Sequence, residues 1–188
     1  AFTTYKYYMI LPLSLAIFII YFFRNPERKI PNEQGIVLAP ADGKIMSINE
    51  VWEDRYLKSN AIQVSIFLSL FNVHINRVPM SGQVEWISRS GNSYLPAFRK
   101  EAADKNVYNA VGIYTDYGRI LVVQITGYIA RRIVCWLQLG DRVETGERFG
   151  LIKFGSCTQI YLPADAEILI QPGDKVRGGE TIIGRFSN

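Results

Sequence analysis

The first strong pattern in the chain is an apolar run without charges near its start. Residues 7–23 read YYMILPLSLAIFIIYFF. A helix of this length rises about 1.5 Å per residue and covers roughly 25 Å, slightly less than the hydrocarbon core of a bilayer. Aromatic side chains gather at both ends of the run, as they do at membrane interfaces. The pattern predicts a membrane-anchoring helix within residues 1–25, and it leaves open whether the segment spans the bilayer or dips into it.

Basic residues follow the apolar run directly, at Arg24, Arg28 and Lys29. Because positive charge stays on the cytoplasmic side, they predict a cell-membrane protein whose downstream domain faces the cytoplasm. The alternatives are a buried core helix and a signal peptide. A signal peptide would carry small residues at a cleavage site, whereas bulky Tyr-Phe-Phe and an arginine stand here. The chain begins with alanine, which leaves open whether further residues precede it.

Beyond a proline-containing linker, β-branched and aromatic runs alternate with turn residues. Asn25-Pro26 and Pro31-Asn32 are expected to end the helix. Four runs are typical of strands, at residues 36–38, 62–68, 112–115 and 120–125. Residues 116–119 predict a hairpin turn between the last two runs. Residues 96–110 are polar and predict a loop over a site.

The β-rich part also contains an internal repeat. GDRVETGE at residues 140–147 recurs as GDKVRGGE at residues 173–180, and a Pro-x-x-small-x-Ile/Val element begins at Pro40, Pro79 and Pro163. Such turns suit short strands of a flattened barrel, similar to the barrel-sandwich folds of biotinyl and lipoyl carriers. The sequence therefore predicts a mainly β, barrel-sandwich-like domain at residues 26–188, preceded by the N-terminal hydrophobic membrane helix.

Composition narrows the classes of function. The net charge of +4 is mild and no dense Lys/Arg run is present, so we expect an anionic membrane surface rather than nucleic acid as partner. Cys135 and Cys157 form no CxxC pair and are expected to be reduced thiols. With His74 as the one histidine of the chain, a metal site is not expected.

Three residues are candidates for chemistry. Ser156 follows Gly155, and a serine hydroxyl can attack the preceding carbonyl when the backbone allows it and a base is present. Taken alone, a Gly-Ser pair is more often a turn. His74 is the one side chain suited to imidazole chemistry near neutral pH, although an isolated histidine among apolar residues is usually a core group. Asp42 stands in an Asp-Gly turn, and its functional interpretation is a carboxylate that orients His74 in a Ser-His-Asp relay.

Five blocks occur in order along the chain: FFRNPER at 22–28, APADG at 39–43, NVHINRVP at 72–79, IARRIVC at 129–135 and RFGLIKFGS at 148–156. Together they resemble the short, membrane-associated phosphatidylserine decarboxylases from about residue 20 to 188. The resemblance implies self-cleavage between Gly155 and Ser156 into a β chain (1–155) and an α chain (156–188). It also implies a pyruvoyl group made from Ser156.

The resemblance implies a decarboxylation as well. The pyruvoyl ketone would form a Schiff base with phosphatidylserine, or with an ether-linked archaeal analogue, and release CO2 and phosphatidylethanolamine. His74 would protonate the carbanion. Longer family members carry a second histidine where this chain has Arg77, and Thr or Ser where it has Cys157, so the division of proton transfers is left open.

Further expectations concern the substrate and the alternatives. Phosphate or carboxylate contacts are expected from side chains in the matching blocks, at Arg131, Arg132, Lys153, Asn72 and Arg77. The oligomeric state is open, a homo-oligomer included. The alternative function is a biotinyl- or lipoyl-like carrier or a membrane adaptor, whose modified lysine would be Lys153 without the usual flanking residues. A metallopeptidase is weaker, because one histidine cannot supply the usual ligands.

Overall fold

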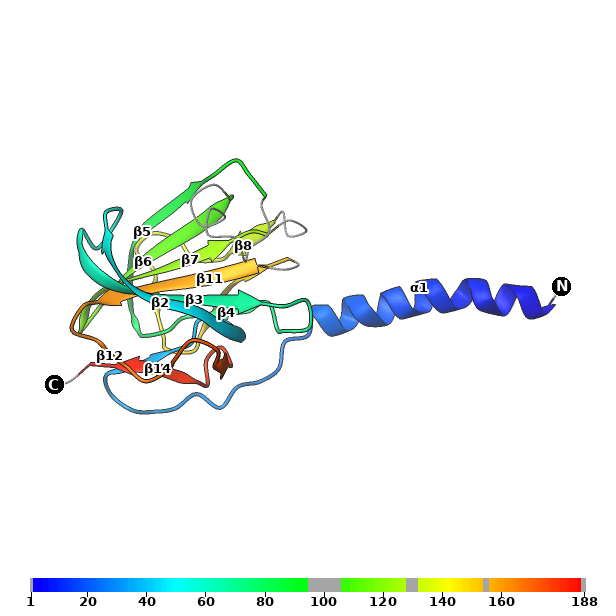
Figure 1. The fold of residues 1–188 in the computed structure, drawn as a ribbon, viewed down its shortest axis with the longest axis horizontal. Helices are drawn as coiled ribbons and strands as arrows, with labels where there is room; N and C mark the ends of the chain where they lie inside the picture. Colours follow the sequence, from blue (N-terminus) through cyan, green and yellow to red (C-terminus); the bar gives the residue numbers. More distant parts are fainter. Residues whose placement is uncertain (1, 95–105, 128–131, 154–155, 187–188) are drawn as a thin grey trace.

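The computed structural model describes residues 2–94, 106–127, 132–153 and 156–186. It contains one helix, α1 (Phe2–Phe22), which extends away from a body of short and long strands (Figure 1). The strands are β1 (Ile36–Leu38), β2 (Gly43–Glu53), β3 (Ser59–Leu68), β4 (Ile75–Arg77), β5 (Gly82–Ser90), β6 (Tyr108–Thr115), β7 (Gly118–Ile125), β8 (Ile133–Cys135), β9 (Arg142–Val143), β10 (Arg148–Ile152), β11 (Ser156–Pro163), β12 (Glu167–Ile168), β13 (Lys175–Val176) and β14 (Ile182–Arg185).

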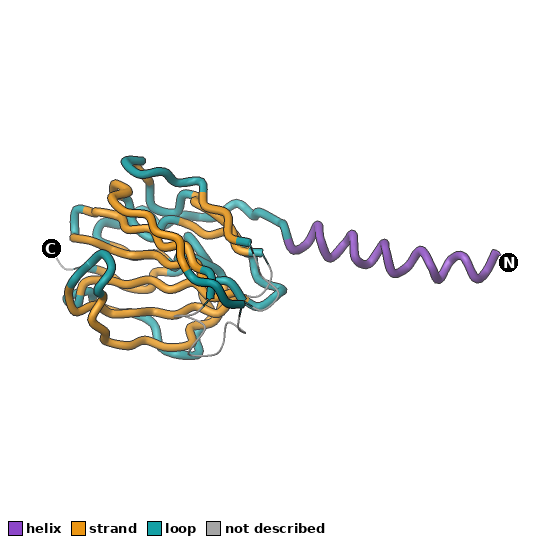
Figure 2. The backbone as a smooth tube through the Cα atoms, turned by 90° about the horizontal axis from the view of Figure 1, so that it is seen from above, coloured by secondary structure: helices purple, strands orange, loops and turns teal. Residues whose placement is uncertain are grey.

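The largest sheet has eight antiparallel strands in the order β13-β2-β3-β11-β7-β6-β5-β9, and it curls into a half-barrel (Figure 2). Two three-stranded sheets, β1-β14-β12 and β4-β10-β8, complete the body. Strand β11 lies at the centre of the large sheet and is buried along most of its length. The prediction of a mainly β domain is confirmed.

The repeat in the sequence corresponds to a pseudo-twofold arrangement of the large sheet. β13 pairs with β2 at one edge, as β9 pairs with β5 at the other. Gly140 and Gly173 both adopt positive φ, 93° and 103°, and their amides donate to equivalent carbonyls, of Val84 and Ile45 respectively. The left-handed conformation favours glycine at both turns. The repeat thus supplies the two edges of the half-barrel, with β11 and β7 on either side of its centre.

Helix α1 carries an apolar surface along its described side chains. Met9, Leu11, Leu13 and Ile20 are more than half exposed, although all are large and apolar. Pro12 lies inside the helix. Over the residues that the structure describes, no helix combines the length and apolar character required to cross a bilayer.

The C-terminal end of α1 is fastened to the body at the turn after β3. Arg24 donates to the backbone carbonyls of Tyr21 (2.9 Å) and Phe71 (2.7 Å). The Phe22 side chain is buried, unlike most of the helix. The base of the helix is therefore part of the folded body.

The expected strands agree with the observed ones in place, and three of the four are longer than expected. The predicted turn at residues 116–119 lies between β6 and β7, which pair as far as Thr115 and Gly118. Of the loop expected at residues 96–110, residues 96–105 lie outside the described residues. The loop prediction is wrong for residues 108–110, because these residues pair with both β5 and β7.

Candidate active site

Ser156 is the first residue of β11, where it pairs with Leu68 at the end of β3. Its side chain is fully buried, and its Oγ has no hydrogen-bond partner among the described residues. A buried hydroxyl without a partner forfeits its bonds to water, so such atoms are rare and point to a function. Gly155, on the other side of the expected cleavage point, lies outside the described residues.

His74 directly precedes β4 and is also buried, with 3% of its surface exposed. Its Nδ1 lies 2.9 Å from the carbonyl oxygen of Asn72. Because a carbonyl can only accept, Nδ1 carries the proton and Nε2 carries the lone pair. Nε2 has no partner within the described chain. His74 therefore presents a free basic nitrogen in a dry environment.

Burial controls the ionisation of His74. The pKa of His74 is lowered from 6.5 to about 4, chiefly because burial removes the ring from water; the bond to Asn72 opposes this shift, and the positive charge of Arg24 adds to it. The Phe22 ring lies against the imidazole with 4.2 Å between centroids. The base of α1 thus helps to keep His74 neutral at pH 7.

Ser156 and His74 lie at the same end of the body. The backbone N–H of Ile152, four residues before Ser156, donates to the carbonyl of His74 (3.2 Å). Leu68, the partner of Ser156, ends the strand that leads into the turn before His74. In Figure 1 this is the end from which α1 departs. Ser156 Oγ and His74 Nε2 are not hydrogen-bonded to each other, since both are without a partner.

Asp42 does not contact His74 in this structure. Its carboxylate accepts two hydrogen bonds from Arg28 Nη2, at 3.0 and 2.9 Å, and a third from the amide of Gly178. Both side chains of the ion pair are largely buried. The relay expected from the sequence is therefore not formed, and the Asn72 carbonyl holds His74 in place of a carboxylate.

The expected substrate-binding residues fall into two groups. Asn72 and Arg77 are engaged within the protein: Asn72 Oδ1 accepts from Ser69, and Arg77 donates to the carbonyls of Gly146 and Pro26. The other group comprises Lys153, whose Nζ lies 5.8 Å from the centre of the Phe23 ring, Arg132, which is exposed, and Arg131, which lies outside the described residues.

Two features of the site were not anticipated from the sequence. One is the Arg28 ion pair, which takes up the Asp42 carboxylate. The other is a set of buried polar side chains that includes Asn76, Gln124 and Thr158. A signal for it exists, because Gln124 interrupts the apolar run at residues 120–125 and a polar residue there needs a buried partner.

The residue after Ser156, Cys157, is a buried thiol. Burial raises the pKa of Cys157 to about 12, so this thiol stays protonated and weakly nucleophilic. Over the described ranges, no three His, Cys, Asp or Glu side chains are grouped to hold a metal ion.

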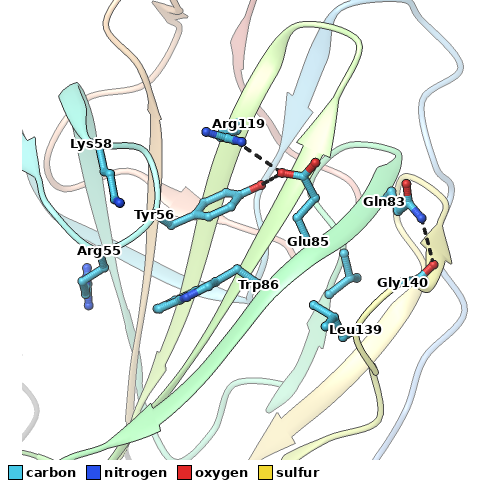
Figure 3. A pocket seen from close by; sticks show the side chains of 10 residues that line it. Arg55, Tyr56, Lys58, Gln83, Glu85, Trp86, Arg119, Leu139 and Gly140 are labelled. Atoms are coloured by element: carbon cyan, nitrogen blue, oxygen red, sulfur yellow. Dashed lines mark hydrogen bonds and ion pairs between the residues drawn. The ribbon is translucent and has the colours of Figure 1, made fainter.

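A cavity of about 550 Å³, lined by residues that include Tyr56, Trp86 and Arg119, does not include Ser156 or His74. Tyr56 and Trp86 stack at 6.0 Å inside it, and Tyr56 donates to Glu85, which also pairs with Arg119 (Figure 3). Gln83 at the rim also donates to the carbonyl of Gly140 (3.2 Å). The buried serine and histidine lie outside this cavity.

Fold and site define a half-barrel β protein in which a buried serine and a neutral histidine lie at the end of the body that carries an apolar helix. A family model described as phosphatidylserine decarboxylase matches residues 15–184. The chain belongs to the phosphatidylserine decarboxylase family, a family of lyases.

Curated relatives agree over nearly the whole chain. A protein of Symbiobacterium thermophilum, named phosphatidylserine decarboxylase proenzyme, is 51% identical over 92% of this chain and 81% of its own length. Proteins with the same name from Carboxydothermus hydrogenoformans and Syntrophus aciditrophicus are 49% and 44% identical, each over 94% of this chain and 84% of the relative. Because the chain belongs to this family, the alternative function of a biotinyl- or lipoyl-like carrier is no longer favoured.

Proposed function

We propose that the chain is the proenzyme of a phosphatidylserine decarboxylase that converts itself at Ser156. The observation that carries the proposal is the pair of buried, unpartnered atoms, Ser156 Oγ and His74 Nε2, at one end of the half-barrel. Family membership supplies the reaction class. The substrate is phosphatidylserine or its ether-linked counterpart, since both carry the same headgroup, and the product is phosphatidylethanolamine.

Self-cleavage uses groups that the chain already holds. His74 Nε2 takes the proton of Ser156 Oγ, and the oxygen attacks the carbonyl carbon of Gly155, so that the amide becomes an ester. Loss of the Ser156 α-proton then breaks the Cβ–O bond, releases Gly155 as a carboxylate and leaves dehydroalanine. Addition of water with loss of ammonia gives a pyruvoyl group at the start of the α chain. Neutral His74 suits the first step, because only the neutral ring accepts a proton.

The buried position of residue 156 suits the pyruvoyl group. When present, that group supplies a ketone that condenses with the substrate amine and takes up the electron pair released with CO2. Residue 156 and its cross-strand partner Leu68 are both fully buried, so water is excluded from this position. His74 is the side chain placed to hold the proton that replaces CO2 on the substrate carbon. A substrate carboxylate near the imidazole would raise the pKa of His74 toward the value that this step requires.

We further propose that Lys153 and Arg132 receive the lipid phosphate, together with Arg131. Lys153 lies beside Phe23 at the base of α1, so its ammonium is close to the expected membrane surface. In this proposal α1 holds the enzyme to the cytoplasmic face of the cell membrane through its exposed apolar side chains. Holding the enzyme at the lipid avoids extraction of acyl chains, which costs about 0.8 kcal/mol per CH2.

The test is a decarboxylation assay on vesicles that contain phosphatidylserine, with phosphatidylethanolamine measured by mass spectrometry. The purified full chain is expected to form product, and Ser156→Ala is expected to form none. Lys153→Ala should raise KM more than it lowers kcat, with Arg142→Ala as the control, because Arg142 is exposed on the edge strand β9, four strands away from β11. Product formation by Ser156→Ala, or no product from a cleaved wild-type chain, would overturn the proposal.

A further inference from the structure

A chain of buried side chains connects the outer part of the large sheet to the strand that begins at Ser156. Arg89 Nε donates to Asn109 Oδ1 (2.9 Å), and Asn109 Nδ2 donates to Gln124 Oε1 (2.9 Å). Gln124 Nε2 donates to Asn76 Oδ1 (2.9 Å), and Asn76 Nδ2 donates to Thr158 Oγ1 (3.0 Å). The four members from Asn109 to Thr158, which we call the amide chain, are almost completely buried.

The outer end of the amide chain determines the direction of every bond in it. A guanidinium only donates, so Arg89 requires the carbonyl oxygen of Asn109 to face it. The NH2 group of Asn109 must then face Gln124, and the same requirement passes to Asn76. The amide chain thus ends with an N–H donor directed at Thr158, in a single arrangement.

Backbone groups hold the same arrangement from the side. The carbonyls of Val134 and Pro40 accept weaker bonds, both 3.4 Å, from Gln124 Nε2 and Asn76 Nδ2 respectively. Gly150 leaves the space for this, because a Cβ there would lie 3.0 Å from Gln124 Nε2 and 2.3 Å from the Val134 carbonyl oxygen. Gly150, the glycine of the RFGLI segment, is therefore needed to leave space for the Gln124 side chain of the amide chain.

The last bond of the amide chain joins β4, which directly follows His74, to β11, which begins at Ser156. Asn76 lies two residues after His74, and Thr158 lies two residues after Ser156. Side chains two residues apart on extended backbone lie on the same face. The bond between Asn76 and Thr158 therefore fixes the relative position of the segments that hold His74 and Ser156.

We propose that the amide chain is a positioning device that sets Ser156 against His74 for self-cleavage, an inference that rests on the proposed function above. Its members do not touch the reacting atoms, so they are positioning residues. Displacement of reacting groups by about 1 Å can slow a reaction by about 100-fold, which makes a rigid, fully bonded support between the two strands effective. A side-chain amide with only part of its hydrogen-bonding groups paired could adopt several orientations at the same place.

The test is the rate of self-cleavage in full-length chains made by cell-free synthesis and followed by gel after synthesis is stopped. Thr158→Val keeps the shape and removes the acceptor, so cleavage should slow about 10-fold or more, whereas Thr158→Ser should stay within about 3-fold of wild type. The matched control is Thr115→Val, which removes another buried hydroxyl, bonded to the carbonyl of Gly118 at the β6–β7 turn. The control should cleave at about the wild-type rate.

Two results would overturn the inference. The first is a cleavage rate in Thr158→Val equal to that of the wild type. The second is that Thr115→Val, with the same loss of thermal stability as Thr158→Val, slows cleavage by the same factor, which would show that Thr158 has a purely structural role. If Thr158→Val does not fold, Asn109→Ala takes its place. Asn109→Ala should slow cleavage about 3-fold or more, and a wild-type cleavage rate in this variant would contradict the inference. If the wild-type chain itself does not cleave, the proposed function fails instead.

Discussion

At the scale of single residues, burial gives His74 a lower pKa than a histidine has in water. It is buried against Phe22 and holds its proton on Nδ1 toward Asn72. The bond to a carbonyl oxygen, rather than to a carboxylate, orients the ring without stabilising its charged form strongly. Neutral His74 is thus available as a base over most of the physiological pH range.

The first prediction concerns stability against pH. The pKa of His74 is about 4 in the folded chain and about 6.5 unfolded, so the unfolded chain binds the proton first and stability falls as the pH drops below 6.5. Between pH 6.5 and pH 5, the protonation of His74 should lower the free energy of unfolding by about 1.5 kcal/mol. Urea unfolding of the uncleaved Ser156→Ala chain should show this loss, and addition of His74→Gln should remove it. An unchanged pH dependence in the double variant would contradict the assignment.

The second prediction separates two roles for Asp42. Asp42→Asn breaks a buried ion pair with Arg28 and should destabilise the chain by about 3 kcal/mol. The NMR signals of the single histidine report the pKa of His74 directly. That pKa should stay unchanged in Asp42→Asn, because Asn72 holds the ring. A lowered pKa with little loss of stability would instead support the relay.

At the scale of elements, α1 is coupled to the chemistry through its last turn. Phe22 covers the imidazole of His74, and Arg24 ties the helix end to the turn that carries Phe71. If α1 lies on a membrane as proposed, a change in its position there would alter how far water reaches His74.

The third prediction tests that coupling. Phe22→Ala opens the imidazole to water, so the pKa of His74 should rise from about 4 toward its ordinary value near 6.5. Phe23→Ala, a neighbouring substitution at an exposed ring, is the control and should move the pKa much less. Histidine NMR titration measures both, and equal pKa values in wild type and Phe22→Ala would contradict the coupling.

Much of the element layout was accessible from the sequence, whereas its side-chain partners were not. The apolar run predicts α1, and the Gly-Asp repeat predicts the turns at both edges of the half-barrel, because these patterns are local. The partner of Asp42 depends on how the linker with Arg28 crosses the body, a long-range contact without a local pattern. The same holds for the bond between Asn76 and Thr158, which joins segments far apart in the chain.

At the scale of the whole molecule, residues 156–186 contact the rest of the body on several sides. β11 pairs with β3 and β7, while β14 pairs with β1 and β13 with β2. Arg28 also binds Glu180, and Asp42 accepts from the amide of Gly178. Cleavage before Ser156 removes one covalent bond and leaves these contacts in place.

The fourth prediction follows from this layout. The two chains produced by cleavage should elute together in size-exclusion chromatography under native conditions and separate in denaturant. Sheet pairing along β11 alone buries most of that strand, so the complex should persist at nanomolar concentration or below. Elution of a free fragment of residues 156–188 from native protein would contradict the prediction.

The most direct test of the central claim is the intact mass of the purified protein under denaturing conditions. The account predicts two species, residues 1–155 with an ordinary carboxyl end and residues 156–188 with a pyruvoyl group in place of the N-terminal serine. Ser156→Ala should give a single uncleaved mass. A wild-type chain that remains whole with an ordinary Ser156, under conditions where the protein is folded, would contradict self-cleavage at this position.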